Sequence, residues 1–517
     1  MKKLLAIITA FILCFALSAN SFAFTFYSQE VTQLEGKIIK QILPSKYHYN
    51  CIAITEDDCL YVWGFNSVNL FHPQENTPKL KLENVASAVN GGSQMAAVTK
   101  NGDLYMWGEN DFGNLGDGTL QSRSTPKKIM ENVASVSLSE RHSAAITKSG
   151  ELYMWGNNAD GQIGDGTKEN RLTPVKIMDN VVSASLNQTQ SAIITADGGF
   201  YIWGEGYDTK PTRLMDNAAD LCLNYIYGGA IITYEHELYC WGRESGNNGN
   251  GTVPEKTLDN VIYVDYGGTG SVTGVNGMAV TASGELYSWG DCDNGQLGNG
   301  TTHFSTDWHG PEDDYKYGYL PSKILDDVIQ ISCGPYHSAA LTRDGSLYMW
   351  GDNNYGQLGN AKSGGEHSTP YSGLIEYYFD KDIDSAVPVK IMDNVAYVSV
   401  GCTYSAVITK DGELYMWGDN DVGQLGTGIH GGDSWKYDEG IDSNVPIKIT
   451  IPDARPGDVN SDGEITLDDA VLTLQRAMNV GITGSVFNES AAGVNSDGEI
   501  TLDDAIEILK RAMNVNS

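Results

Sequence analysis

The dipeptide Trp-Gly occurs eight times in this chain of 517 residues, and no other feature limits its possible folds as strongly. Intervals of about 40 to 70 residues are typical of solenoids and propellers, in which every repeat is one supersecondary unit. The fullest units read LYMWG, followed a few residues later by GQLG. The tryptophans are Trp63, Trp107, Trp155, Trp203, Trp241, Trp289, Trp350 and Trp417. We therefore divide the central part of the chain into eight units.

Each unit is predicted to contain short β-strands. Segments such as SAAIT and ELYMW are short and apolar, and a turn such as Asn101-Gly102 separates them. Glycine at the second turn position supplies the positive φ that a tight hairpin needs. Alternation along LYMW places Tyr and Trp on one face of the sheet, and Leu and Met on the other. Because both faces are apolar, each sheet must lie between two neighbours, as the four-stranded blades of a β-propeller do.

The first 23 residues are predicted to be a signal peptide. Two lysines precede the apolar stretch LLAIITAFILCFALSA, and small residues follow it up to Ala23. This stretch is shorter than the roughly 20 apolar residues that a membrane span needs, and no later segment qualifies. We therefore expect a secreted, extracellular protein without a membrane span, whose mature chain begins near Phe24.

The pattern LYMWGxNxxGQLGxG, found over residues 38–449, resembles the repeat of the regulator of chromosome condensation family. The resemblance implies a mainly all-β fold, a propeller that in this family usually has seven blades. We expect eight four-stranded blades within residues 24–450, one for each unit, and keep seven as the alternative. The alternative stays open because the first, fourth and fifth units lack the GQLG part.

Nuclear members of that family exchange the nucleotide of a small GTPase and bind chromatin, but fold alone does not fix function. The formal net charge here is −33, which repels phosphate backbones, so we expect no nucleic acid partner. The repeat is also similar to that of an exported bacterial β-lactamase inhibitor. Both comparisons imply that the faces and rim of the propeller bind another molecule.

The cysteines favour no disulfide scaffold and no zinc site. The chain has eight, and Cys14 falls in the signal peptide, so an odd number remains, without a Cys-x-x-Cys pair. We expect these residues to be small buried apolar groups.

Three consecutive units contain long insertions after GQLG, at residues 301–320, 361–387 and 429–445. Equivalent positions in consecutive blades lie on the same side of a propeller, so the insertions are expected to be neighbours. Their aromatic side chains favour a surface that binds a protein or a glycan, because Trp and Tyr bury much area at a low entropy cost. The alternative is that the loops cover one another. The candidates are Trp308, Tyr315, Tyr317, Tyr377, Tyr378, Trp435 and Tyr437.

The insertions also hold carboxylates, and a glycosidase-type acid/base pair among them is one interpretation of these residues. They are Glu312, Asp313, Asp314, Glu376, Asp380 and Asp382. Carboxylates on surface loops are usually solvated. The sequence contains no His-Glu-x-x-His, no Gly-x-Ser-x-Gly and no phosphate-binding glycine loop. We therefore predict no catalytic residues and favour a binding protein over an enzyme.

The segment VNSDGEITLDDA occupies residues 459–470 and recurs at residues 494–505. With Asp458 as position 1, oxygen-bearing residues fall at positions 1, 3, 5, 7, 9 and 12, and Gly463 permits the sharp turn at position 6. This is the spacing of a calcium-binding loop. The predicted ligands are Asp458, Asn460, Asp462, Glu464, Thr466, Asp469, Asn495, Asp497, Glu499, Thr501 and Asp504.

Two such loops, each with Asp at position 12 and the first without a preceding helix, resemble the type I dockerin domain. The resemblance covers residues 457–517 and follows a linker at 451–456. It implies a small helical domain that holds two calcium ions and binds a cohesin module on a scaffold protein of a bacterial polysaccharide-degrading complex. The implied cohesin contacts are Leu467, Asp468, Gln475, Arg476, Leu502, Asp503, Lys510 and Arg511.

The two halves of this segment differ at position 1, where Asp458 in the first loop corresponds to Gly493 in the second. Because the second loop has one carboxylate fewer, we predict that its calcium site is the weaker one. The contact residues match between the halves, so we also expect two binding orientations related by half a turn.

These observations together predict a secreted, non-catalytic binding protein, tethered by a dockerin and presenting a propeller. Two alternatives remain at this stage. The first alternative is a carbohydrate-active component of such a complex, because most dockerin-bearing chains carry catalysts. The second alternative is an inhibitor of a secreted enzyme.

Overall fold

The computed structural model describes most residues of the repeat region and a few of the C-terminal segment. Contacts divide the chain into two compact units, with the change from one to the other at Ile449 and Thr450, and each unit is described by itself. The described residues are 37–46, 48–65, 75–224, 228–242, 252–268, 275–290, 294–302, 320–364, 380, 382–429, 442–451, 470–474, 504–506 and 508–509.

The first and second strands of every repeat are six to eight residues long and lie nearest the axis of the ring. The second strands, with sequences such as HSAAIT, are buried along their whole length. The first strands are β1 Ile39–Pro44, β5 Val85–Asn90, β9 Val133–Leu138, β13 Val181–Leu186, β17 Ala218–Leu223, β21 Val261–Gly268, β25 Val328–Cys333 and β29 Val395–Val400. The second strands are β2 Asn50–Thr55, β6 Gln94–Thr99, β10 His142–Thr147, β14 Gln190–Thr195, β18 Gly228–Thr233, β22 Val275–Thr281, β26 His337–Thr342 and β30 Tyr404–Thr409.

The third strand of every repeat holds LYMWG or a close variant of it, and the fourth strand lies at the outer edge, with the P-x-K-I-M segment in β8, β12 and β28. The third strands are β3 Leu60–Gly64, β7 Leu104–Gly108, β11 Leu152–Gly156, β15 Phe200–Gly204, β19 Leu238–Gly242, β23 Leu286–Gly290, β27 Leu347–Gly351 and β31 Leu414–Gly418. The fourth strands are β4 Glu75–Leu82, β8 Arg123–Met130, β12 Arg171–Met178, β16 Thr212–Met215, β20 Glu255–Leu258, β24 Ser322–Leu325, β28 Ser385–Met392 and β32 Ser443–Ile449.

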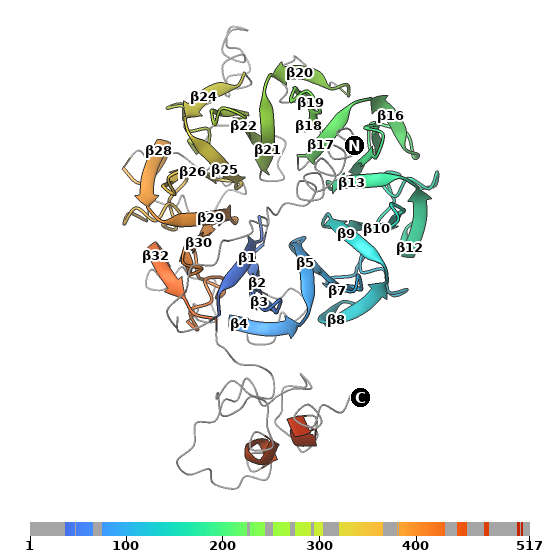
Figure 1. The fold of residues 1–517 in the computed structure, drawn as a ribbon, viewed down its shortest axis with the longest axis horizontal. Coiled ribbons are helices and arrows are strands. Elements are labelled where there is room, and N and C mark those ends of the chain that lie inside the picture. The colour runs from blue at the N-terminus through green and yellow to red at the C-terminus, as the bar shows by residue number, and fades with distance from the viewer. Residues whose placement is uncertain are drawn as a thin grey trace, which may run out of the picture. The chain divides into compact units, whose positions relative to one another are not determined.

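Eight blades form a closed ring (Figure 1). Each blade consists of four strands that are consecutive in sequence and antiparallel, so blade 1 is β1–β4 and blade 8 is β29–β32. The first strands contact one another in the order β1, β5, β9, β13, β17, β21, β25 and β29, and β29 contacts β1. The prediction of eight blades is therefore confirmed over the seven-blade alternative.

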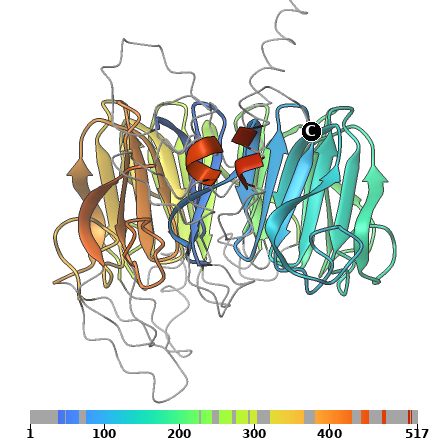
Figure 2. The same cartoon turned by 90° about the horizontal axis from the view of Figure 1, so that it is seen from below.

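The strands run between two faces of the ring (Figure 2). We name as the loop face the one at which the first strands end, at residues such as Leu138 and Leu186. The connections between third and fourth strands also lie on this face, because strand direction alternates within a blade. The tight turns lie on the opposite face, where Gly102 and Gly150 have φ values of 92° and 81°. These values explain glycine at the second turn position.

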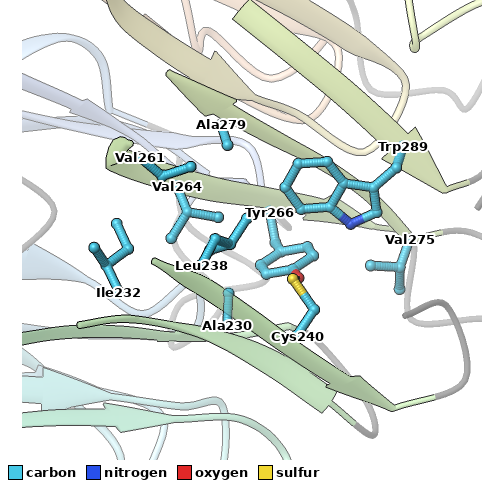
Figure 3. Close-up of a cluster of buried hydrophobic side chains, with 10 residues drawn as sticks. All are labelled: Ala230, Ile232, Leu238, Cys240, Val261, Val264, Tyr266, Val275, Ala279 and Trp289. Carbon is cyan, nitrogen blue, oxygen red and sulfur yellow. The ribbon is translucent and has the colours of Figure 1, made fainter. Parts of the chain in front are cut away.

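Apolar side chains fill the spaces between blades, as the alternation in LYMW predicts. Leu104 and Met106 of blade 2 pack against Val136 and Trp155 of blade 3 in one buried cluster. Tyr153 is packed against the same cluster, so Leu and Met point towards the following blade while Tyr and Trp point towards the preceding one. Figure 3 shows the equivalent cluster between blades 5 and 6. The propeller therefore has a ring of inter-blade cores instead of a single central core.

Five junctions between blades share a hydrogen-bonded contact that we name the tryptophan staple. In each one, the indole Nε1 of one blade donates to a main-chain carbonyl in the loop after the third strand of the preceding blade, at 2.8–3.0 Å. The staples join Trp155 to Asn114, Trp203 to Gln162, Trp350 to Gln296, Trp417 to Gln357 and Trp63 to Gln424. The GQLG segment is therefore the part of a blade that receives the tryptophan of its neighbour.

The staple also explains the last glycine of GQLG. A Cβ on Gly298 would lie 2.8 Å from Nε1 of Trp350, and a Cβ on Gly359 would lie 2.7 Å from Nε1 of Trp417. Both glycines have positive φ, so two independent constraints act on each position.

The junction from blade 8 to blade 1 closes the ring through side-chain and main-chain hydrogen bonds, without an exchanged strand. Trp63 of blade 1 makes the staple to Gln424 of blade 8, at 3.0 Å. The hydroxyl of Tyr404 donates to the carbonyl of Asn50 at 2.6 Å and accepts from the backbone N–H of Ser45 at 3.0 Å. Blade 1 is thus held by the same kind of contact that joins other neighbouring blades.

The second unit is described only in part. Residues 470–474, 504–506 and 508–509 are helical, and Thr473, Asp504 and Ile508 are fully buried. Across the part of the chain that the structure describes, no helix has the length and apolar character needed to cross a bilayer.

Candidate functional site

Most of the residues predicted from sequence as site residues lie outside the described residues. This holds for the aromatic candidates of the insertions and for all of the expected cohesin contacts. Among the expected calcium ligands, Asp504 is described, and its side chain is fully buried. Among the insertion carboxylates, Asp380 and Asp382 are described, and the backbone N–H of Asp382 donates to Asp380 at 2.9 Å.

The insertions of blades 7 and 8 are anchored on the loop face by one aspartate each, buried in blade 7 and half-buried in blade 8. The backbone N–H of Asn353 donates to Asp384 at 2.8 Å, and that of Asn420 donates to Asp442 at 2.9 Å. Burial raises the pKa of Asp442 to about 7 and that of Asp384 to about 6. Each anchor therefore carries a proton more readily than a surface aspartate does.

Each anchor lies beside a second aspartate that directly follows the Trp-Gly dipeptide. These are Asp352 in blade 7 and Asp419 in blade 8, both buried. Burial raises the pKa of Asp352 to about 7 and that of Asp419 to about 6. In blade 3, Asn157 and Asn170 hold these two positions and make equivalent bonds. Blades 7 and 8 therefore differ from blade 3 by two acid pairs in place of neutral amides.

Carboxylate oxygens of Asp419, Asp421 and Asp442 lie within 4.8 Å of one another. Asp419 accepts the backbone N–H of Asp421 at 2.9 Å and the hydroxyl of Thr403 at 2.8 Å. Together with the bond from Asn420 to Asp442, these contacts explain the cluster as the anchor of a loop.

A cavity of about 270 Å³ lies on the ring axis, between the ends of the first strands at the loop face. The first strands contribute small side chains at their fifth position, so space remains on the axis. The cavity-lining residues at this position are Leu43, Val89, Ser137, Ser185, Cys222, Asp265 and Ser399. Asp220 and Tyr263, which precede Cys222 and Asp265 by two residues on the same strand faces, also line it.

One wall of this axial cavity already binds an ammonium group. Nζ of Lys46, in the loop after β1, donates to Asp265 Oδ1 at 2.8 Å and to the carbonyl of Tyr266 at 3.0 Å. The other carboxylate oxygen of Asp265 accepts the backbone N–H of Cys333 at 2.9 Å. Lys46 keeps a side-chain exposure of 25%, whereas Asp265 keeps 7%. The charge of Asp265 is thus neutralised from blade 1.

Asp220, on the neighbouring blade 5, has no such cation among the described residues. Its carboxylate accepts the backbone N–H of Leu221 at 2.8 Å. Burial raises the pKa of Asp220 to about 7. Burial, with the charges of Asp265 and Asp220, also raises the pKa of Cys222 to about 12, so this thiol stays protonated. Asp220 therefore leaves negative charge in the cavity wall above pH 7.

The rim of the cavity contains Glu140, which accepts a hydrogen bond from Nε2 of Gln188 at 2.9 Å. Nε2 of His48 lies 4.0 Å from Glu140. Burial nevertheless lowers the pKa of His48, because it outweighs the attraction of Glu140 and Glu109. At neutral pH this contact therefore joins a neutral imidazole to a carboxylate, and the rim adds a further negative charge.

The axial residues are not apparent as a site from the sequence alone. A signal was present, because first strands such as VASVSL and VVSASL have Ser at positions 3 and 5, whereas AADLCL has Asp at position 3. Only the closed ring shows that these positions face one axis. The sequence alone therefore does not indicate that Asp220 lines an axial cavity.

Comparisons with known proteins agree with this architecture. The model of the regulator of chromosome condensation (RCC1) repeat matches just over half of the chain. A second model of the same repeat matches residues 133–162, 328–357 and 395–424. The first matches residues 101–146, 149–194, 283–341, 344–408 and 411–459. A closed propeller that carries repeats of this kind defines the class of protein, and the chain belongs to the RCC1 repeat family. A dockerin type I domain matches residues 456–514, so the chain also carries a C-terminal dockerin.

Curated relatives share only part of their length with this chain. The mouse E3 ubiquitin-protein ligase HERC2 is 34% identical over 203 residues, which are 37% of this chain and 4% of that protein. The mitochondrial RCC1 domain-containing protein RUG3 of Arabidopsis thaliana is 34% identical over 214 residues, 38% of this chain and 41% of that protein. The chain thus spans less than half of the length of these relatives.

Among solved structures, Prp20p from Saccharomyces cerevisiae aligns over 82% of this chain and 90% of that one, with a TM-score of 0.49 and 19% identity. Human WBSCR16 aligns over 77% of this chain and 94% of that one, with a TM-score of 0.49 and 21% identity.

Proposed function

We propose that this chain is a secreted, non-catalytic binding protein, anchored through its dockerin to a cohesin module of a scaffold protein in a polysaccharide-degrading complex. The propeller presents its loop face to a protein or a glycan. The observation that carries the proposal is the dockerin match at residues 456–514, directly after a closed propeller of the RCC1 type. Dockerins direct assembly onto cohesins, and RCC1 propellers are interaction modules.

Calcium fits the second unit by its ligand chemistry. The two loops supply carboxylate, amide and hydroxyl oxygens at the spacing that calcium prefers. The full burial of Asp504, at position 12 of the second loop, is compatible with a ligand that faces an ion. When bound, the ions would neutralise the loop carboxylates and couple metal affinity to folding of the domain.

The difference between Asp458 and Gly493 gives a direct test of the two calcium sites. We expect calorimetry of residues 24–517 to resolve two sites that differ by about tenfold or more in affinity, because the second loop lacks one carboxylate. Gly493→Asp should bring the sites together, and Asp458→Gly should weaken the first. Two equal, tight sites in the natural chain would contradict the assignment.

The tether and the propeller can be separated by a capture experiment. Residues 24–517 and residues 24–452 are each used to capture secreted proteins of the producing organism, with calcium and with a chelator. A scaffold protein that binds only the longer chain and is released by the chelator supports cohesin docking. Capture of the same scaffold by the shorter chain would refute it.

A partner of the shorter chain that ignores the chelator identifies what the loop face binds. Polysaccharides are tested in the same way by retention on insoluble glycans. Hydrolysis of those glycans by the longer chain would contradict the non-catalytic assignment.

A further inference from the structure

The axial cavity combines three properties that together define a ligand class. Its volume of about 270 Å³ is below that of typical sites for drug-sized molecules, so it suits a small group or one side chain. It opens at the loop face, because its walls are the ends of the first strands. Its lining contains one basic group, Lys46, against three carboxylates, Asp220, Asp265 and Glu140.

The charges do not balance within the cavity. The ammonium group of Lys46 donates to Asp265 and to the carbonyl of Tyr266, so it is already paired with blade 6. Glu140 is bound to the neutral amide of Gln188. Asp220 accepts a backbone N–H and forms no ion pair with a described residue. Asp220 is half-buried, and a carboxylate withdrawn from water without a counter-ion is costly.

The fold itself shows how this cavity holds a cation. The ammonium of Lys46 is bound by one carboxylate and one main-chain carbonyl, both from a first strand. Asp220 is one strand away and one layer deeper, since it lies two positions earlier than the residue aligned with Asp265. A second cation entering along the axis would meet Asp220 and the hydroxyls of Ser137 and Ser185.

Among the described residues, no lysine or arginine forms an ion pair with Asp220. The segments 225–227 and 269–274, which follow β17 and β21 in sequence, contain no lysine or arginine.

We propose that the axial cavity is a binding site for a primary ammonium or guanidinium group, with Asp220 as its counter-charge. The group comes either from a basic side chain of a partner on the loop face or from a small free amine. This site deepens the proposed function. Only the choice between the two sources of the group rests on that function.

The test uses the full mature chain at pH 8, where Asp220 is ionised, and three probes of matched length: n-butylguanidinium, n-butylammonium and n-butanol. Ligand-observed NMR or calorimetry measures their binding. The two cations are expected to bind with a Kd of about 1–10 mM, as is reasonable for ligands of this size. n-Butanol, which lacks the charge, should bind at least about tenfold more weakly.

Asp220→Asn keeps the shape of the side chain and removes its charge. We expect it to weaken binding of both cations about tenfold or more. Asp259→Asn is the matched control, because Asp259 is an exposed carboxylate of the same blade, paired with Lys256 on the outer strand. Asp220→Ser repeats the test with the residue that other first strands have at this position.

Equal binding of the cations to the natural chain and to Asp220→Asn overturns the proposal, and so does the absence of saturable binding to the natural chain. This arm contains no partner, so it is independent of whether the loop face captures a protein. The source is then assigned with the captured partner: its loss in Asp220→Asn assigns a basic side chain, and its retention assigns a free amine.

Discussion

The propeller contains two kinds of blade junction, and their difference lies in a single loop. At the junctions from blade 2 to 3, 3 to 4, 6 to 7, 7 to 8 and 8 to 1, the loop after the third strand accepts the tryptophan of the next blade. Blades 1, 4 and 5 lack this GQLG loop in their sequence. At the junction from blade 4 to 5, the indole N–H of Trp241 is buried and has no hydrogen-bond partner in the described structure.

The blades that contribute the tryptophan also differ between the two kinds of junction. At four of the five stapled junctions a serine paired with the tryptophan donates to the same carbonyl, as Ser338 does to Gln296 at 2.9 Å and Ser405 does to Gln357 at 2.8 Å. At the fifth junction, Cys51 holds this position. The aligned residue is Gly229 in blade 5 and Gly277 in blade 6. A Cβ there would lie 3.0 Å and 2.6 Å from the indole rings of Trp241 and Trp289. Blades 5 and 6 therefore have a glycine against the indole ring of their own blade, where four of the stapled blades have a hydrogen-bonding serine.

The largest expected effect comes from breaking a staple sterically. Gly298→Ala places a Cβ 2.8 Å from Nε1 of the fully buried Trp350, and Gly300→Ala, two residues later, meets nothing within 4 Å. Both glycines have positive φ, so the pair separates the clash from backbone strain. We expect losses in unfolding free energy of about 2–4 kcal/mol for Gly298→Ala and about 1–2 kcal/mol for Gly300→Ala. Denaturant unfolding measures both, and equal losses would show that the staple tolerates displacement.

A comparison of two tryptophans sharpens the contrast between junctions. Trp350→Phe removes a hydrogen bond of 2.8 Å to Gln296, whereas Trp241→Phe removes an N–H that is buried without a partner. The loss of ring area is the same in both variants. We expect Trp350→Phe to be the more destabilising by about 1–3 kcal/mol. If thermal unfolding shows no gap between the two variants, the staple contributes packing alone.

The acid pairs add a pH dependence to one stapled junction. Gln357, whose carbonyl receives Trp417, donates its side-chain amide to Asp352 at 2.8 Å. Because the folded pKa of Asp352 is about 7 and the ordinary value is 3.8, the ionised form opposes folding above pH 7. Stability from this group therefore rises as the pH falls from 7 towards 4.

Asp352→Asn should remove that dependence, because Asn157 holds the equivalent position in blade 3 and accepts Gln162 at 3.2 Å. We expect the variant to be more stable than the natural chain by about 1–2 kcal/mol at pH 8, with the gap closing towards pH 4. Unfolding curves over this range measure the gap, and a constant gap would contradict the assignment. Burial lowers the pKa values of His142 and His337 to about 3, so these residues reduce the free energy of unfolding below pH 6.5. This reduction is the same in the natural chain and the variant, and it cancels when the two are compared.

The smallest effect is expected on the outer rim, where both kinds of blade carry the same ion pairs. Lys176 in blade 3 lies 2.8 Å from Asp179, and Lys256 in blade 5 lies 2.8 Å from Asp259. These exposed pairs contribute little to stability. Lys176→Gln and Lys256→Gln should leave the melting temperature unchanged within error. A measurable loss confined to Lys256→Gln would indicate that the rim compensates for a missing staple.

Much of the fold could be predicted from sequence, because the repeat carries its own register. The Trp-Gly dipeptide, the glycine turns and the LYMW alternation indicated eight sheets that are apolar on both faces, and the structure has these. The role of GQLG as acceptor of the next tryptophan could not be predicted, because the acceptor is a main-chain carbonyl. The axial site could not be predicted either, since Lys46 and Asp265 are 219 residues apart and meet only when the ring closes.

Each blade is built from four consecutive strands, and no strand is exchanged where blade 8 meets blade 1. One sequence repeat thus corresponds to one complete blade. Duplication of a stretch of gene from one Asn-Val connection to the next would add a complete blade, with its own tryptophan staple and its own serine donor. An added blade would not require a strand to change partners elsewhere. A ring built in this way can change its blade number by one step of recombination.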